Sequence, residues 1–264
     1  MNRAALLVIA ATIIGAGCGE PSSPRFPSGT VVDLSHAYDA QAIFWPTADP
    51  FRLEKVADGV TPAGYYYAAN NFFTSEHGGT HVDAPVHFAE GHQTVDQIPV
   101  ERLMGEAMVV DVREASARNA DYQVTADDLQ RAEQEAGPIP TDAIVLLRTG
   151  FSERWPDAAR YLGTAARGAE AVQQLHFPGL HPEAAKWLIA NRSIKAIGID
   201  TASIDFGQST LFESHRLLYA RDIPAFENLT ALDRLPPRGA FVIALPMKIR
   251  GGSGAPLRAV AIVP

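Results

Sequence analysis

The feature that most restricts how this chain can fold is a cluster of histidines. Four of its eight histidines lie between His77 and His92, in a segment that begins His-Gly-Gly-Thr-His-Val-Asp-Ala-Pro-Val-His-Phe. Alternate side chains of an extended chain share one face, so His81, Asp83 and His87 are predicted to point the same way. The two glycines that follow His77 permit a tight turn that returns this histidine to the same side.

Imidazoles and a carboxylate on one face need partners, because an unpaired ring nitrogen is costly to bury. A divalent ion such as Zn²⁺, Mn²⁺ or Fe²⁺ satisfies such a group, and imidazole with carboxylate is a ligand set that these ions accept. The segment therefore predicts a metal centre. Four other histidines are expected to be structural or solvated: His92, which follows the cluster in a turn, and His36, His176 and His181.

Composition excludes several other classes of protein. Of the 264 residues, 47% are hydrophobic and 20% are charged, which suits a large folded core and not a disordered chain. The formal net charge of −8 argues against nucleic acid as a partner, because phosphate binding needs a basic surface. The single cysteine excludes an internal disulfide. No glycine-rich phosphate loop and no Gly-x-Ser-x-Gly elbow is present, which argues against nucleotide and serine-nucleophile chemistry.

The first 29 residues are typical of an exported lipoprotein. One arginine precedes an uncharged run from Ala4 to Gly17, shorter than the roughly 20 residues that span a bilayer, and Cys18 follows directly. The Ala-Gly-Cys ending resembles a bacterial lipoprotein signal, although Gly15 stands where a leucine-like residue is usual. We therefore predict a signal peptide over 1–17, lipidation of Cys18 and a flexible tether over 18–29. The protein would lie outside the cytoplasm, in the periplasm or beyond, held to a bacterial membrane only by its lipid; plain secretion is the alternative.

Residues 30–264 contain no second linker and no repeat, so a single domain is expected. Three helices are predicted: 129–136 after a capping pattern at Thr125, one from Pro182 to about Arg192, and 212–220. Strands and helices interleave without strict alternation, which favours an α/β (α+β-like) fold with a mixed central β-sheet flanked by helices. Runs rich in β-branched and apolar residues predict strands over 30–34, 65–73, 107–112, 143–148, 195–199, 240–245 and 257–263.

The pattern His-x-Gly-Thr-His-x-Asp-x-Pro-x-His-Phe over 77–88 resembles the signature of the cyclase-type metal-dependent hydrolases, which include bacterial kynurenine formamidase and isatin hydrolase. The resemblance extends over essentially 30–264. It includes Phe44-Trp45-Pro46, the segments 198–201 and 203–205, His215 with Glu227 twelve residues later, and the glycine-rich stretch 251–258. It implies the single hydrolase domain of that family, and dimers or larger assemblies with shared pockets.

Carried over residue by residue, the resemblance implies that His77, His81 and Asp83 are metal ligands. His87 would be the general base or proton shuttle. Phe44 and Trp45 lie where the family has an aromatic wall for its substrate.

The resemblance leaves the number of ions open. In members with two ions, Asp83 and Glu227 would bridge them and His215 would hold the second. In members with one ion, usually manganese, His215 would be a catalytic or hydrogen-bonding residue. The cofactor is therefore expected to be one or two divalent ions, Mn²⁺ or Zn²⁺.

Both lines of reasoning predict hydrolysis by a metal-activated water. The first hypothesis is the opening of a cyclic aryl amide such as isatin to isatinate, because segments 175–180, 205–209 and 244–249 resemble the isatin hydrolases more closely. The export signal favours the same branch. The alternative enzyme is an arylformamidase that acts on N-formylkynurenine. A hypothesis of another class is an exported lipoprotein that binds a metal or ligand without turnover; the extra base His87 argues for catalysis.

Overall fold

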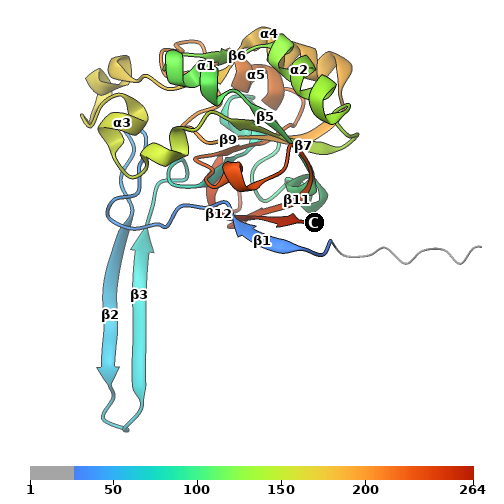
Figure 1. Ribbon diagram of the computed structural model, residues 1–264. Helices are drawn as coiled ribbons and strands as arrows, with labels where there is room; N and C mark the ends of the chain where they lie inside the picture. The colour runs from blue at the N-terminus through green and yellow to red at the C-terminus, as the bar shows by residue number, and fades with distance from the viewer. Residues whose placement is uncertain (1–26) are drawn as a thin grey trace, which may run out of the picture.

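The computed structural model describes residues 27–264, so the predicted signal peptide, Cys18 and most of the predicted tether lie outside the described residues. Its main feature is an eight-stranded sheet with the order β1-β12-β11-β5-β7-β9-β10-β4 (Figure 1). Because β12 also pairs with β4, the sheet closes on itself. Its strands are β1 (Thr30–Asp33), β4 (His81–Asp83), β5 (Met104–Asp111), β7 (Ala143–Arg148), β9 (Ile194–Ile199), β10 (Ala225–Glu227), β11 (Arg238–Pro246) and β12 (Gly254–Val263).

The sheet is mixed, as predicted. The pairs β5–β7, β7–β9 and β9–β10 are parallel, whereas the pairs that involve β1, β4, β11 and β12 are antiparallel. The predicted strand over 143–148 matches β7 at both ends, and the other predicted strands overlap observed ones, with ends that differ by up to three residues. The α/β class with helices beside a central sheet is therefore confirmed.

The longer helices lie together on one side of the sheet (Figure 1). They are α2 (Ala126–Ala136), α4 (Pro182–Asn191) and α5 (Glu213–Tyr219). The capping pattern forms the expected box, in which the Thr125 hydroxyl accepts a bond from the Asp128 N–H and the Asp128 carboxylate accepts one from the Thr125 N–H. The remaining short elements are α1 (Arg113–Arg118), α3 (Ala158–Leu162), β6 (Gln123–Val124), β8 (Gly179–Leu180) and the 3₁₀ turns η1 (Pro85–His87), η2 (Val100–Leu103), η3 (Phe151–Arg154), η4 (Ala169–Gln174) and η5 (Leu232–Arg234).

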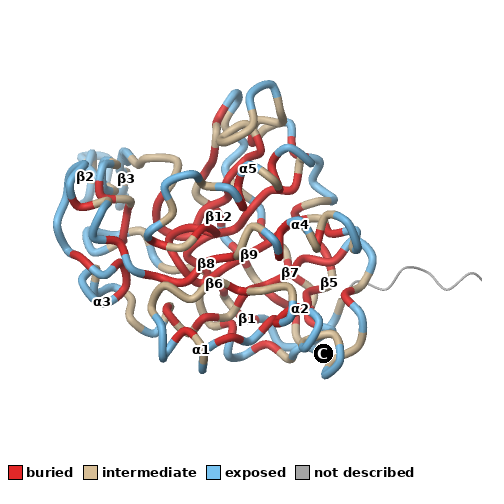
Figure 2. Tube along the Cα trace, turned by 90° about the horizontal axis from the view of Figure 1, so that it is seen from above, coloured by how far each residue is buried: buried red, intermediate tan, exposed pale blue. Residues whose placement is uncertain are grey.

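The core has two main layers because the strands alternate. On β5, Ala107 and Val109 join the cluster inside the closed sheet, whereas Met108 and Val110 pack toward the helices. Figure 2 shows the resulting buried centre. Among the described residues, no helix is long and apolar enough to span a bilayer.

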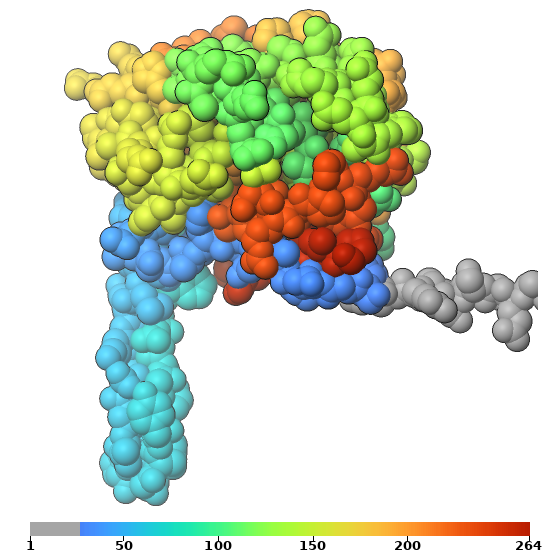
Figure 3. All heavy atoms as spheres, in the orientation of Figure 1, coloured from blue at the N-terminus to red at the C-terminus, as the bar shows by residue number. Residues whose placement is uncertain are grey.

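One part of the chain stands apart from this body. The strands β2 (Arg52–Val60) and β3 (Tyr66–Phe73) form a separate antiparallel hairpin that projects far from the closed sheet (Figures 1 and 3). We call residues 52–73 the arm. Its second strand was predicted, but β2 was not, because charged and small residues interrupt its apolar pattern.

Candidate metal centre and its cavity

The site is built on β4, a strand of only three residues that is hydrogen-bonded along both edges. On one edge it pairs with β10, in a register that places Glu227 opposite His81. On the other edge it pairs with β12, where Gly254 lies opposite Asp83. The two closures fix His81 and Asp83, which are each at most 2% exposed, and bring in Glu227 from 146 residues further along the chain.

The chain reaches His87 by a different route from the one predicted. The expectation of an extended segment from 81 to 87 was wrong, because Pro85 begins the 3₁₀ turn η1 at 85–87. The turn nevertheless returns the side chain to the cluster, where the His87 ring stacks on His77 with the ring centroids 3.8 Å apart.

The two glycines act as predicted at the turn before β4. Gly79 has φ +58, a conformation that favours glycine, and a Cβ on Gly78 would lie 2.0 Å from a ring carbon of Phe44. This close approach lets His77 turn back, so that its Nδ1 lies 2.6 Å from Asp83 Oδ1.

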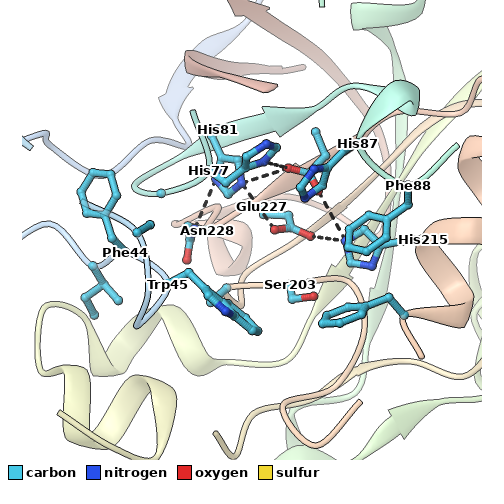
Figure 4. A pocket seen from close by; sticks show the side chains of 16 residues that line it. Phe44, Trp45, His77, His81, His87, Phe88, Ser203, His215, Glu227 and Asn228 are labelled. Atoms are coloured by element: carbon cyan, nitrogen blue, oxygen red, sulfur yellow. Dashed lines mark hydrogen bonds and ion pairs between the residues drawn. The ribbon is translucent and has the colours of Figure 1, made fainter. Parts of the chain in front are cut away.

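Asp83 lies at the centre of the cluster, with a different pair of histidines at each of its oxygens. Figure 4 labels these four histidines, which converge at one end of the cavity. Oδ1 lies 2.6 Å from His77 Nδ1 and 3.1 Å from His81 Nε2. Oδ2 lies 3.4 Å from His215 Nε2 and 3.9 Å from His87 Nε2. All five side chains come together as the sequence predicted.

The two carboxylate oxygens of Glu227 also face different histidines. Its Oε2 lies 3.5 Å from His81 Nε2 and its Oε1 lies 3.2 Å from His215 Nε2. Two carboxylates thus each face the same two histidines with separate oxygens, an arrangement that suits bridging ligands.

His81 provides a test of whether this group suits a metal. Its Nδ1 lies 3.0 Å from the Gly79 carbonyl, which places the ring proton there and leaves the lone pair on Nε2. That Nε2 is buried among the carboxylates of Asp83 and Glu227 but forms no hydrogen bond with any described residue. A buried acceptor nitrogen facing two carboxylates fits a divalent ion.

His215, on α5, is oriented in a similar way. Its Nδ1 lies 2.5 Å from Asp205 Oδ2, so the proton on this nitrogen points at Asp205 and Nε2 faces the cluster. The Asp205 carboxylate also accepts bonds from the N–H groups of Ser214 and His215 in the first turn of α5. One carboxylate therefore fixes both the helix and the ring.

The pKa shifts show how strongly the cluster attracts positive charge. Burial alone would lower the pKa of His215, but hydrogen bonds to Asp205, Asp83 and Glu227 raise it well above the usual value. Burial and the nearby charge of Asp83 raise the pKa of Glu227, whereas the surrounding histidines hold the pKa of Asp83 well below normal. The described side chains therefore hold protons at the centre that a bound cation would replace.

His87 differs from the other histidines of the cluster. Its side chain is 30% exposed, and partial burial, which outweighs the nearby charge of Asp83, lowers its pKa to about 4. It is thus neutral at physiological pH and reachable from outside, as a proton acceptor must be.

Three residues near the cluster were missed by the sequence analysis: Tyr219, whose hydroxyl donates to Asp83 Oδ2 at 2.9 Å, and the pair Ser253 and Glu76. The Ser253 hydroxyl lies 2.9 Å from His77 Nε2 and donates to the Glu76 carboxylate at 2.6 Å. Glycines flank this serine because a side chain would not fit there. A Cβ at Gly252 would lie 2.8 Å from Glu76, and a Cβ at Gly254 would lie 2.6 Å from His77. A serine inside a glycine-rich loop was the only signal in the sequence, and it does not indicate which side chain the loop contacts.

A cavity of about 300 Å³ opens onto the cluster. Its walls include Phe44 and Trp45, as expected from the resemblance, together with Phe88 and Phe212, which were not singled out (Figure 4 shows the first three). Its mixed lining of aromatic rings and a polar end suits a small aromatic molecule with one polar group.

The other four histidines lie outside the cluster. His36 stacks on Trp155, His92 pairs with Asp222, His176 pairs with Asp121, and His181 caps α4. None of the four lines the cavity.

A closed mixed sheet that buries histidines and carboxylates at the end of an aromatic cavity defines a metal-dependent hydrolase. The chain belongs to the cyclase family, which matches residues 32–206. Its relatives in this family hydrolyse amide C–N bonds, and this chain is an enzyme of the same class.

Two curated relatives represent two branches of the family. The isatin hydrolase of Roseibium aggregatum is 34% identical over 209 residues, which are 76% of this chain and 77% of the relative. The kynurenine formamidase of Sphingopyxis alaskensis is 28% identical over 228 residues, which are 86% of this chain and 95% of the relative.

The solved structures agree with the first of these. Isatin hydrolase A from Ralstonia solanacearum superposes with a TM-score of 0.80 at 36% identity, over 89% of this chain and 92% of that one. An isatin hydrolase bound to the product analogue thioisatinate gives a TM-score of 0.79 at 30% identity, over 89% and 92%.

Proposed function

We propose that this protein opens a cyclic aryl amide such as isatin to the ring-opened acid, isatinate. The observation that carries the proposal is a buried cluster of histidines and carboxylates at the polar end of an aromatic cavity. The partly exposed base His87 lines the same cavity beside this cluster. The likeness to isatin hydrolases in sequence and fold supports the choice of substrate.

His77, His81, Asp83, His215 and Glu227 would hold the metal. We propose one or two ions, Mn²⁺ or Zn²⁺; the two separate oxygens on each carboxylate support two neighbouring positions. When bound, a divalent ion supplies Lewis acidity toward the substrate carbonyl and lowers the pKa of water to about 7.

The side chains of the cavity would orient the substrate and transfer the proton. Phe44 and Trp45 hold the aromatic ring of the substrate so that its amide carbonyl faces the cluster. His87 Nε2 accepts a proton from the attacking water and returns it to the amide nitrogen. One water is consumed, because its hydroxyl adds to the carbonyl carbon while the C–N bond breaks.

The test uses the chain from Gly19 onward, loaded separately with Mn²⁺ and Zn²⁺, with isatin and N-formylkynurenine followed side by side by absorbance. We expect isatin opening that stops on chelation and returns when the metal is restored. Absence of isatin turnover with metal bound would overturn the assignment.

An arylformamidase is the second candidate, and the 95% coverage of a kynurenine formamidase by this chain favours it. Faster turnover of N-formylkynurenine than of isatin would establish it. A protein that binds metal without turnover is tested by His87→Ala, which we expect to keep the metal and lose hydrolysis. If no member of a panel of aryl amides, formamides and lactones reacted with the metal-loaded protein, binding alone would be the function.

We propose further that the protein is exported and anchored by a lipid on Cys18. The short uncharged run and the Ala-Gly-Cys ending support this. Incorporation of labelled palmitate into the wild-type chain, and its absence from Cys18→Ser, is the expected result. Equal labelling of both chains would contradict it.

We also propose that two copies associate through their arms. An isolated two-stranded hairpin is marginally stable in water, and within the described residues no third strand joins the arm. Large apolar side chains nonetheless cover it. Those that are 43–73% exposed are Leu53, Val56, Val60, Tyr65, Tyr66, Tyr67, Phe72 and Phe73.

A second copy of the chain suits the arm better than a charged partner. The arm carries two basic and two acidic side chains, so its net charge is zero although the whole chain is formally −8. Small residues, Ala57, Ala68 and Ala69, lie midway between the aromatic residues of the tip and those of the base. Two arms side by side in opposite directions would place the tip of each against the base of the other. Covering these side chains would bury roughly 500–800 Å² per copy, the size of an ordinary interface.

A further inference from the structure

Phe212 has an unusual backbone conformation beside the cavity. The described chain has five non-glycine residues with positive φ, and Phe212, at φ 47 and ψ 47, is the only aromatic one. The left-handed region carries an energetic cost for a non-glycine residue, because its Cβ crowds the neighbouring backbone. Such a cost persists only where the surrounding structure fixes the conformation, and it is typical of functional sites.

Hydrogen bonds connect this residue to the metal cluster. The Phe212 N–H donates to Ser209 Oγ at 3.2 Å, and the Ser209 hydroxyl lies 3.4 Å from Asp205 Oδ1. The other oxygen of Asp205 accepts from His215 Nδ1. A single buried carboxylate therefore positions the loop that carries Phe212 and also the proposed metal ligand His215.

The left-handed turn directs the Phe212 ring into the wall of the cavity. The ring centroid lies 5.0 Å from that of Phe88 at an interplanar angle of 30°, and 6.5 Å from that of Trp45. Phe88 in turn lies 4.7 Å from the His215 ring. Phe212 and Trp45 thus come from distant parts of the chain and line the same cavity, next to the cluster.

We propose that Phe212 determines substrate specificity, forming with Trp45, whose ring is tilted by 59° to its own, an aromatic corner of the cavity whose position relative to His215 is fixed through Asp205. This corner favours a flat aromatic ring that packs against it, and the strained backbone is the cost of placing the Phe212 ring there. The substrate class rests on the proposed function, but the binding of a flat aromatic molecule does not require turnover.

The experiment compares Phe212→Ala with Leu211→Ala, a control at the adjacent position whose side chain is 61% exposed. Indole serves as an unreactive probe, titrated by calorimetry into the metal-loaded full chain. We expect Phe212→Ala to bind indole about 10-fold more weakly at unchanged metal content, because one of the two rings of the aromatic corner is lost. Leu211→Ala should bind as the wild type does. Wild-type affinity for indole in Phe212→Ala would overturn the proposal.

Phe212→Gly separates the ring from the strain. Glycine adopts the left-handed conformation at little cost, so Phe212→Gly should be more resistant to urea than Phe212→Ala while binding indole equally weakly. If Phe212→Gly were the less resistant of the two, the strain argument would be wrong.

Kinetics on isatin then distinguish this proposal from the proposed function. A KM raised about 10-fold in Phe212→Ala, with kcat changed less, is the expected result for a residue that only holds the ring. If the wild type binds indole, Phe212→Ala does not, and neither hydrolyses isatin, the specificity role stands and the proposed substrate is wrong. If Phe212→Ala fails to fold, Phe212→Leu, which keeps the volume but not the flat ring, replaces it in the same titration.

Discussion

The metal cluster and the arm depart from ordinary burial in opposite directions. Around Asp83 the fold buries carboxylates and imidazoles, groups that are costly to remove from water unless they are paired. In the arm it exposes tyrosines and phenylalanines, which normally contribute most when they are buried. We infer that each region is arranged for a further partner: a cation inside the closed sheet and, as proposed above, a second apolar surface outside it.

Two desolvated histidines show how burial can be accompanied by opposite electrostatics. His36 is half-buried against Trp155 with its Nε2 unpaired among the described residues, and desolvation lowers its pKa to about 4. His215 is surrounded by Asp205, Asp83 and Glu227, and its pKa is raised. Acidic neighbours, and not burial, therefore distinguish a cation site from a core histidine.

The largest effect is expected from Asp83→Asn. It removes the charge that every histidine of the cluster faces, so metal affinity and turnover should fall about 10³-fold or more, equivalent to ~4 kcal/mol. Metal content by mass spectrometry and the rate of amide hydrolysis measure this. Asp222→Asn, which removes the charge beside His92 and keeps an oxygen for the Gln93 N–H, is the matched control. Retention of metal in Asp83→Asn would break the interpretation of the cluster.

The arm is tested by the double variant Tyr65→Ser and Tyr67→Ser. Each interface of two copies would lose four tyrosine rings, and the dissociation constant should rise about 10²-fold or more. Sedimentation across a range of concentrations measures it. Val100→Ser, an apolar residue of similar exposure on the body, should associate as the wild type does. A wild-type chain that stays monomeric at all concentrations would refute the proposed role of the arm.

The lowered pKa of His36 predicts that the stability of the fold depends on pH. Its pKa is about 4 in the folded chain and about 6.5 when unfolded, so the unfolded chain binds more protons and stability falls as pH drops through this window. Between pH 7 and pH 5 the loss due to this residue is about 2 kcal/mol. Urea unfolding of His36→Phe should show a smaller loss over that range than the wild type does. His176→Gln, at an exposed site, should behave like the wild type; equal losses in His36→Phe would contradict the prediction.

The smallest effect concerns Ser253. Its hydroxyl connects His77 to Glu76, so Ser253→Ala should free the His77 ring and weaken metal affinity about 10-fold. Competition with a chelator measures this affinity. Ser193→Ala, which loses a hydrogen bond to the exposed Asp142, provides the comparison. No change in affinity would show that the other ligands alone position His77.

Much of the fold was predictable because its signals are local. The capping box at Thr125, Pro182 at the start of α4 and the apolar run of β7 each depend on a few adjacent residues. The turn η1 was missed, because a single proline decided between an extended and a 3₁₀ path. The strand β2 was missed because no face of it is buried, so it lacks the alternation that marks a strand.

The sequence by itself determined the chemistry of the centre. The spacing from His77 to His87 placed four ligand-type side chains within eleven residues, and no long-range contact was needed to infer a metal. Only the tertiary structure decided the remainder. The closure of β12 onto β4 and the register of β10 brought Glu227 opposite His81, and α5 supplied His215 with its Asp205 anchor. Strand register and helix docking depend on packing between distant segments, so the sequence specifies these contacts only through the whole fold.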